Sequence, residues 1–283
     1  MKDNTKLGIL SVFLTIDGEA NVYGTGIWSV FVRTRGCTVG CHWCDTKYSW
    51  SNKGGEEFYA SELLEVLEDV LRKNRAEKVR KVTLTGGEPL EQDWVALYLF
   101  MRLLIDKGYH VTVETAGTQD TILFREGFKN GWPTLNLSFQ NLSFVVDYKL
   151  KSSQFKGEMD PDHFANLRHG DVVKFVIDSS DDLHEASSMA HWLNKQRMFG
   201  ARMYFSPSHN HIEPEMLVHK MRALGLPQIG VGLNMQMQKY IWPEDVRTEE
   251  DTGVDFTKRT LGREEYLRRI RSGDETENQV QST

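Results

Sequence analysis

The chain has 283 residues, 40% of them hydrophobic, and a formal net charge of -6, so it is long enough to bury the core of one large α/β domain or two small ones. The negative charge argues against nucleic acid as the main partner, and no apolar run is long enough to cross a bilayer. All three cysteines lie in one short stretch, which is not a disulfide framework, and no signal-peptide pattern opens the chain, so we expect a reducing, cytoplasmic location.

The first third of the chain predicts two strands and a helix. Residues 7–19 alternate apolar and polar side chains and end in a polar turn, and residues 28–33 form a β-rich run. Beyond the cysteines, apolar side chains at helical spacing follow Ser61, which we expect to cap the helix.

From residue 81 onward, strands alternate with helices. The predicted strands cover residues 81–85, 109–114, 143–147, 172–177, 202–205 and 229–233. Three helices are predicted between these strands. The first ends near Gly108, the second starts at Ser180 or Asp181, and the third has Pro214 in its first turn and stops at Gly225. Strands separated by helices imply a parallel sheet, and about six such strands are too few to close an eight-stranded barrel. We therefore expect an α/β fold, a partial (β/α)6-type barrel, with its site at the C-terminal strand ends.

The composition changes near residue 244. We divide the chain into a core domain, 1–243, and a charged C-terminal extension, 244–283. Residues 263–271 predict a short amphipathic helix, and the final ten residues are expected to be disordered.

Cys37, Cys41 and Cys44 have the spacing C-x3-C-x2-C, with Trp43 before the last of them. Thiolates in one loop suit an iron–sulfur cluster or zinc. A cubane cluster takes four ligands, so three cysteines would leave one iron open. The alternatives are a zinc site that adds His42, or three ordinary buried thiols; a His beside Cys41 is awkward for zinc, which usually takes its ligands in two pairs.

Polar motifs follow three of the predicted strands. They are Thr85-Gly86-Gly87-Glu88, Glu114-Thr115 and Asp147-Tyr148-Lys149. Taken singly, the plainer interpretation is a sharp strand-to-helix turn for the first motif, a polar turn for the second and a solvated strand end for the third. Because the C-terminal ends of parallel strands meet at one edge, we expect these motifs to gather beside the cysteine loop.

The cysteine loop resembles the signature of the radical S-adenosylmethionine (SAM) enzymes. The resemblance implies that Cys37, Cys41 and Cys44 hold a [4Fe-4S] cluster whose open iron binds the amino and carboxylate groups of SAM. It implies SAM contacts from Trp43, Gly86, Gly87, Glu88, Glu114, Thr115, Ser138, Asp147, Tyr148 and Lys149.

Three further segments resemble one family within this group, 7-carboxy-7-deazaguanine synthase of the queuosine pathway. The segments are Ile16-Asp17-Gly18-Glu19, Val30-Phe31-Val32-Arg33 and Cys44-Asp45-Thr46. Enzymes of this family are lyases that convert 6-carboxy-5,6,7,8-tetrahydropterin into 7-carboxy-7-deazaguanine, with loss of ammonia, through a 5'-deoxyadenosyl radical. A cytoplasmic homodimer, and an electron donor such as flavodoxin or ferredoxin, are implied as well.

The same resemblance assigns the substrate site. Thr46 matches a Mg2+ ligand, Arg33 would grip the substrate carboxylate, and the pterin ring would meet Ile16, Asp17, Gly18, Glu19 and Thr85. For Arg33 and Glu19 the plainer interpretation is an ordinary ion pair. Three residues depart from the family pattern: Asp17 in place of glutamine, Ala20 in place of a glycine, and Gln238 in place of histidine.

Two other functions are compatible with the cysteine loop. One is an activase that makes a glycyl radical on a partner protein, and the other is a non-catalytic iron–sulfur or zinc protein acting as a redox sensor or binding module. Glu19, Arg33 and Thr46 favour a small acidic substrate over a partner protein.

Overall fold

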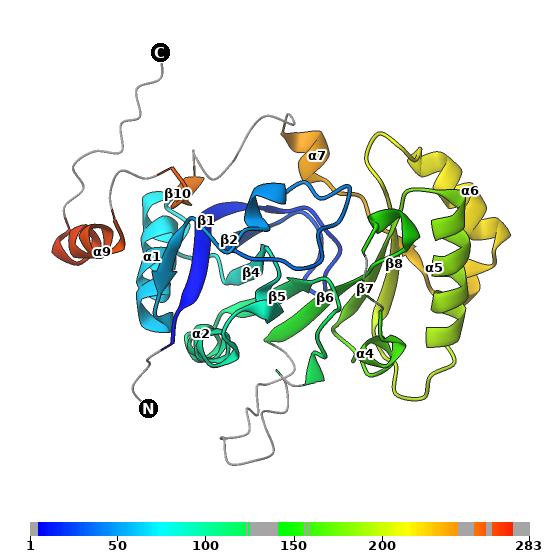
Figure 1. The fold of residues 1–283 in the computed structure, drawn as a ribbon, viewed down its shortest axis with the longest axis horizontal. Coiled ribbons are helices and arrows are strands. Elements are labelled where there is room, and N and C mark those ends of the chain that lie inside the picture. Colours follow the sequence, from blue (N-terminus) through cyan, green and yellow to red (C-terminus); the bar gives the residue numbers. More distant parts are fainter. Residues whose placement is uncertain are drawn as a thin grey trace.

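A computed structural model describes residues 5–122, 124, 141–155, 157, 159–242, 252–258 and 262–273 (Figure 1). The strands are β1 (Leu7–Asp17), β2 (Ile27–Thr34), β3 (Glu56–Phe58), β4 (Lys81–Gly86), β5 (His110–Thr115), β6 (Leu142–Tyr148), β7 (Val172–Ile177), β8 (Arg202–Pro207), β9 (Gly232–Leu233) and β10 (Gly253–Asp255). The helices are α1 (Ala60–Lys73), α2 (Trp94–Asp106), α4 (Pro161–Ala165), α5 (Ser180–Leu193), α6 (Pro214–Ala223), α7 (Gln238–Ile241) and α9 (Arg263–Ser272).

All described strands form one open sheet. Its order is β10-β1-β2-β4-β5-β6-β7-β8-β9, and β3 also pairs with β1. Neighbours from β2 to β9 are parallel, because helical or long connections carry the chain back before each new strand. Strand β1 is antiparallel to β2, because only a short loop joins the two, and β3 and β10 are also antiparallel to β1. The prediction of a partial barrel is confirmed.

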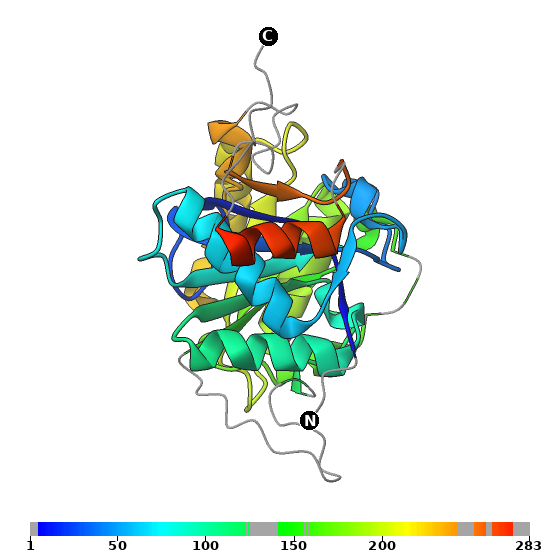
Figure 2. The same cartoon turned by 90° about the vertical axis from the view of Figure 1, so that its left-hand side faces the viewer.

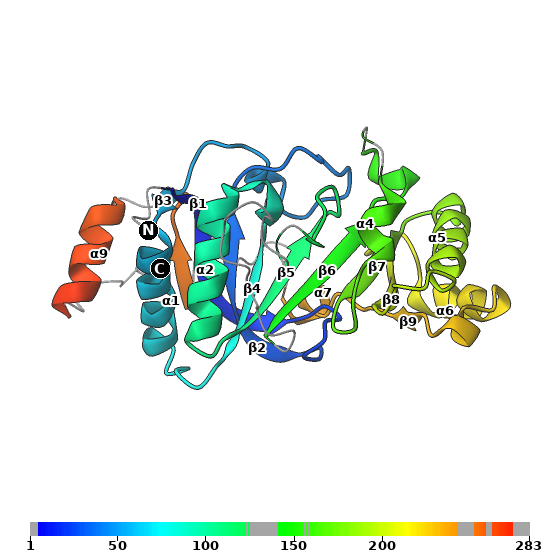
Figure 3. The ribbon, with the colours of Figure 1, turned by 90° about the horizontal axis from the view of Figure 1, so that it is seen from below.

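The two faces of the sheet differ sharply. The outer face, which α1, α2 and α5 cover (Figure 3), is apolar and includes Val12, Leu14, Val30, Val32, Val82, Leu84, Val111 and Val113. The inner face carries buried hydroxyls that bond across the strands, Ser29 to Thr83 at 2.9 Å and Thr112 to Ser143 at 3.2 Å. Burying polar groups is tolerable only when they are hydrogen-bonded, so this face is built for polar ligands at its rim and not for a second helical layer.

Two predicted boundaries are wrong. Helix α1 begins at Ala60, and the Glu62 carboxylate accepts the Tyr59 N–H at 3.0 Å, so Ser61 lies inside the helix and does not cap it. The last predicted strand shrinks to β9, because Leu226–Ile229 form a 3-10 turn that begins after Gly225 in the left-handed region. The helix that starts at Ser180 and the one with Pro214 in its first turn are confirmed.

The C-terminal segment returns to the N-terminal edge of the sheet. Strand β10 pairs with β1, and α9 lies along α1 (Figure 2). The Phe256 ring lies 4.9 Å from that of Phe58 and 6.0 Å from that of Tyr266. The edge of β1, a potential template for aggregation, is therefore covered by the chain itself. The boundary at residue 243/244 stays a prediction, and the final ten residues lie outside the described part.

Replacing Tyr266 with phenylalanine should weaken this docking. The Tyr266 hydroxyl donates to the buried Asp69 carboxylate at 2.8 Å, and Asp69 also pairs with Lys73 at 2.9 Å. Loss of a buried hydrogen bond to a charged group should lower the free energy of unfolding by about 1–2 kcal/mol in chemical denaturation. Tyr240→Phe, at an exposed position, is the control. Equal unfolding curves for both variants would show that α9 does not stabilise the fold through this contact.

In the ranges that the structure describes, helices are all too short or too polar to span a membrane.

Candidate active site

The cysteine loop leaves the end of β2 and is held at its base by backbone hydrogen bonds. The Gly36 N–H donates to Ser49 and the Cys37 N–H to Trp50, at 2.7 and 3.2 Å. The Glu88 N–H donates to the Gly36 carbonyl at 2.7 Å, which ties the loop to the turn after β4. The loop is therefore fixed against a rigid strand end, as a metal-binding loop needs to be.

Gly86 and Gly87 are required by the protein backbone itself. Gly86 has φ +115°, which disfavours any other residue. A Cβ on Gly87 would come within 2.1 Å of the Gly36 carbonyl oxygen. The glycine pair thus allows the turn after β4 to approach the cysteine loop, and both residues also line the cavity described next.

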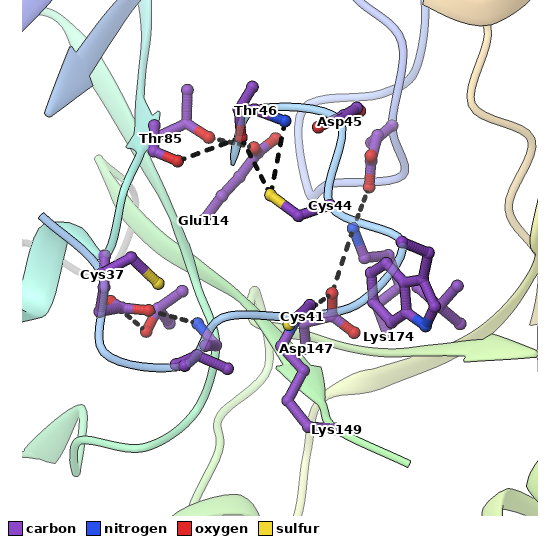
Figure 4. A pocket seen from close by; sticks show the side chains of 18 of the residues that line it. Cys37, Cys41, Cys44, Asp45, Thr46, Thr85, Glu114, Asp147, Lys149 and Lys174 are labelled. Carbon is purple, nitrogen blue, oxygen red and sulfur yellow. Dashed lines mark hydrogen bonds and ion pairs between the residues drawn. The ribbon is translucent and has the colours of Figure 1, made fainter. Parts of the chain in front are cut away.

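A single cavity brings the predicted motifs together at the C-terminal ends of the strands. The predicted residues that line it are Glu19, Cys37, Cys41, Trp43, Cys44, Thr46, Thr85, Gly86, Gly87, Glu88, Glu114, Thr115, Asp147 and Lys149. Figure 4 shows the three cysteines on one loop and, around the same space, Glu114, Asp147, Lys149 and Lys174. Strand ends from β4 to β7 therefore converge on one site, as the topology predicts.

Other predicted residues do not line this cavity. Asp17 is buried and accepts hydrogen bonds from Lys81 and Thr83, and the Arg33 guanidinium lies over the Phe13 ring at 5.3 Å. Ile16 and Gly18 also lie outside the lining. Their substrate-binding roles stay predictions.

The two remaining residues of the SAM prediction have different outcomes. Tyr148 packs against Phe164 and Phe175 on the outer side of the sheet, because successive strand residues face opposite ways and its neighbours Asp147 and Lys149 face the cavity. Ser138 lies outside the described residues.

Sequence reasoning missed several cavity residues. They are Val39, Asp45, Trp50, Ala116, Val145, Lys174, Val176, Ser208, His209, Gln236 and Lys239. Lys174 had a usable signal, since it is the one charge in the apolar strand Val172–Ile177. Asp45 belongs to the segment Cys44-Asp45-Thr46 but was not assigned a role. Most of the others gave no signal of their own, because their approach to the cavity depends on tertiary packing.

Glu88 joins two strand ends through its buried carboxylate. It accepts the Leu90 N–H at 3.0 Å, the Thr115 hydroxyl at 2.7 Å and the Ala116 N–H at 2.6 Å. Burial raises its pKa in spite of these donors. The turns after β4 and β5 are thereby locked to each other at the cavity wall.

Glu114 is the second buried acid of the wall. Its carboxylate accepts the Thr85 hydroxyl at 2.8 Å. Burial, with added repulsion from Glu19 and Asp17, raises its pKa to about 7. A carboxyl group with this pKa is partly protonated at neutral pH, so it both accepts and donates hydrogen bonds.

Glu114→Gln should stabilise the protein at high pH. A folded-state pKa near 7, above the ordinary 4.5, means that the folded state holds this proton more tightly, so the free energy of unfolding falls as pH rises through that window. Glutamine cannot ionise and so avoids the cost of a buried negative charge. We therefore expect the free energy of unfolding of the variant to exceed that of the wild type by roughly 1–3 kcal/mol at pH 8, and the difference to disappear below pH about 4.5. Chemical denaturation at both pH values measures it, with exposed Glu68→Gln as control. A gain that does not vary with pH would contradict this assignment.

The donor set fits an iron–sulfur cluster better than zinc. In the described ranges, no three Cys, His, Asp or Glu side chains are grouped around the position of one metal ion. Zinc needs its ligands to converge on one point, whereas each cysteine of a cubane cluster holds a different iron, so the sulfur atoms stay apart. His42 is exposed and lies outside the cavity lining, which removes the fourth ligand of the zinc alternative.

The surroundings of the thiols fit a bound cofactor. Apolar Val39 and Ala116 pack with Cys41, and burial raises the pKa of the Cys37 and Cys41 thiols. Among the described residues, Trp43 Nε1 and Asp147 Oδ1 are buried without a hydrogen-bond partner, and both residues line the cavity. Buried polar atoms normally have partners, so a donor and an acceptor here are available to a ligand.

Comparisons with known proteins agree with this geometry. Residues 31–151 match the model of the radical SAM superfamily. The 7-carboxy-7-deazaguanine synthase of Clostridium acetobutylicum is 33% identical over 240 residues, which are 84% of this chain and 97% of that protein. The enzyme of the same name from Leptospira interrogans is 28% identical over 259 residues, or 85% and 97% of the two chains.

The fold also matches a solved structure. The crystal structure of QueE from Escherichia coli superposes with a TM-score of 0.58 at 21% identity, over 81% of this chain and 93% of that one. The family assignment rests on the sequence match to the Clostridium acetobutylicum enzyme, because both its identity and its coverage of the two chains are high enough to show the family. This chain belongs to the 7-carboxy-7-deazaguanine synthase family of the radical SAM superfamily.

Proposed function

We propose that this protein is a radical SAM lyase that converts 6-carboxy-5,6,7,8-tetrahydropterin into 7-carboxy-7-deazaguanine with loss of ammonia. One observation carries the proposal: the three cysteines, the turn with Glu88 and the acids Glu114 and Asp147 line the same cavity as Glu19. The residues that we assign to the cofactor and to the substrate would thus share one space.

In the cofactor half, Cys37, Cys41 and Cys44 would hold the [4Fe-4S] cluster. When bound, the cluster and SAM supply the organic radical that starts the reaction. Glu88 fixes the wall where the SAM amino group is expected, and Asp147 Oδ1 is an open acceptor for a hydroxyl or ammonium group. Lys149, 5.1 Å from the Trp43 ring centroid, adds a cation beside Cys41.

In the substrate half, Glu19 would accept N–H groups of the pterin ring. Thr46, whose hydroxyl lies 3.4 Å from the Gly86 carbonyl, is our candidate Mg2+ ligand, because a hydroxyl is a hard oxygen donor. Arg33 is our candidate for the substrate carboxylate, which its planar guanidinium would bind in a bidentate manner. The enclosing loops and strand ends would keep water from reactive groups.

The partners follow from this assignment. An electron donor such as flavodoxin or ferredoxin would reduce the cluster, and a cytoplasmic homodimer is the expected form. Neither nucleic acid nor a membrane is needed for the reaction.

Anaerobic turnover tests the proposal. The protein is reconstituted with iron and sulfide, supplied with SAM, Mg2+, dithionite and 6-carboxytetrahydropterin, and its products are followed by mass spectrometry. We expect 7-carboxy-7-deazaguanine. Cleavage of SAM without this product would contradict the substrate assignment, and zinc in the purified protein with no SAM cleavage would contradict the enzyme assignment.

A further inference from the structure

Lys174 is the strongest unassigned feature of the cavity. It lies in β7 between Val173 and Phe175, which are buried on the outer side, and its own side chain reaches the inner face and lines the cavity (Figure 4). Its side chain is 11% exposed. A buried lysine is rare unless it is paired, and this one is paired with acids of both halves of the cavity.

The first partner of Lys174 is Glu19 Oε2, which contacts its ammonium directly. The second is Asp147 Oδ2, at 3.8 Å, in the neighbouring strand β6. Asp147 has its own closer cation, Lys149 at 2.8 Å, whereas the other side-chain hydrogen bonds described for Glu19 come from neutral amides. Glu19 is therefore the main ion-pair partner of Lys174.

Glu19 is surrounded by donors. Its Oε1 accepts from Gln236, just before α7, at 3.0 Å and from Gln238, the first residue of α7, at 3.5 Å. Lys239 adds a more distant positive charge near Glu19, while the Glu114 carboxylate on β5 repels the Glu19 carboxylate. The two amides are neutral donors that a ligand N–H can replace, but the ammonium contact is charge-assisted and stays.

We propose that Lys174 is a positioning residue for substrate recognition: it keeps Glu19 ionised and in one orientation, so that Glu19 presents only acceptor oxygens to the N–H edge of a flat heterocycle. The proposal rests on the proposed function and deepens it. It names a residue of β7 that acts on the substrate through another side chain.

Removing the lysine should change the charge of Glu19. Burial by itself raises the pKa of Glu19, and Lys174 is the main opposing influence, so that the pKa is lowered overall. Without Lys174, burial and the repulsion from Glu114 prevail, so the pKa of Glu19 rises and more of this carboxyl group is protonated. A protonated carboxyl group offers an O–H donor where the ligand needs an acceptor.

The experiment measures KM and kcat of Lys174→Met and Lys174→Arg between pH 6 and 9, in the reconstituted enzyme. We expect Lys174→Met to raise KM for 6-carboxytetrahydropterin roughly 10- to 100-fold at pH 7, the cost of one charge-assisted bond, with a smaller change in kcat. KM should recover as pH rises, because Glu19 ionises again. The substrate KM of Lys174→Arg should stay near that of the wild type. The SAM affinity of both variants should change little. Lys151→Met removes an exposed lysine charge as control.

A double variant separates positioning from a merely structural role. If Lys174 acts through Glu19, adding Lys174→Met to Glu19→Gln should leave the substrate KM unchanged. The proposal would be overturned if Lys174→Met raised the substrate KM equally at every pH and this rise added to that of Glu19→Gln. It would also be overturned if Lys174→Met left the substrate KM unchanged. If Lys174→Met does not fold, Lys174→Gln provides the same test. Absence of turnover in the wild type would instead overturn the proposed function, and this inference with it.

Discussion

Replacing Cys41 with alanine is expected to abolish turnover and to prevent assembly of the cluster. Cys41 is buried, sits between the other two cysteines of the loop, and lines the cavity. With two thiolates left, the loop cannot supply three of the four ligands that a cubane cluster requires. A full cluster corresponds to about four iron atoms per chain, and the iron content of the variant should fall well below this value. The visible absorption of the cluster should disappear.

The apo protein provides the control for this substitution. Alanine occupies slightly less space than cysteine, so the thermal unfolding of the apo variant should match that of the apo wild type within a few degrees. Loss of iron together with retained folding would assign Cys41 to the cluster. A Cys41→Ala protein that still binds iron in full and forms product would contradict the assignment of this loop.

Glu88→Gln is expected to weaken SAM binding about 10- to 100-fold, the value of one charge-assisted hydrogen bond. The substitution removes the negative charge that we assign to the SAM amino group. It also places an amide NH2 against one of the donors that Glu88 now satisfies, the N–H groups of Leu90 and Ala116 and the hydroxyl of Thr115. The free energy of unfolding should therefore fall as well, by roughly 1–3 kcal/mol.

Calorimetric titration of the reconstituted, anaerobic protein with SAM measures the first effect, and chemical denaturation the second. Glu68→Gln removes an exposed carboxylate on α1 and should leave both values unchanged. If Glu88→Gln loses stability but keeps its SAM affinity, Glu88 only joins the two strand ends. In that case the SAM amino group must be held elsewhere on the wall.

The sequence predicted the site better than it predicted the edges of the fold. The cysteine spacing and the motifs at the C-terminal ends of β4, β5 and β6 are local patterns. Parallel topology brings these strand ends together whatever the details of packing. Strand β10 could not be predicted, because its three residues become a strand only by pairing with β1, far away in the sequence. The N-cap of α1 was missed because the acceptor is Glu62, and not the serine inside the helix.

Asp17 illustrates a second kind of limit. From the sequence, an acid in place of the usual glutamine suggests a changed substrate contact. In the structure, the carboxylate is buried against Lys81, which is 64 residues away in the chain, and against Thr83. A charge at one position is thus matched by a charge on another strand, and no local pattern in the sequence reveals such a pair.

The most direct test of the central claim is an isotope measurement with substrate deuterated at C6. The reconstituted enzyme is incubated anaerobically with SAM and this substrate, and SAM and product are then analysed by mass spectrometry. If the 5'-deoxyadenosyl radical takes hydrogen from C6 of the substrate and hydrogen is later returned to regenerate SAM, deuterium should appear in the recovered SAM while 7-carboxy-7-deazaguanine accumulates. Product that forms with no deuterium in SAM, or SAM that is cleaved with no product, would contradict the account.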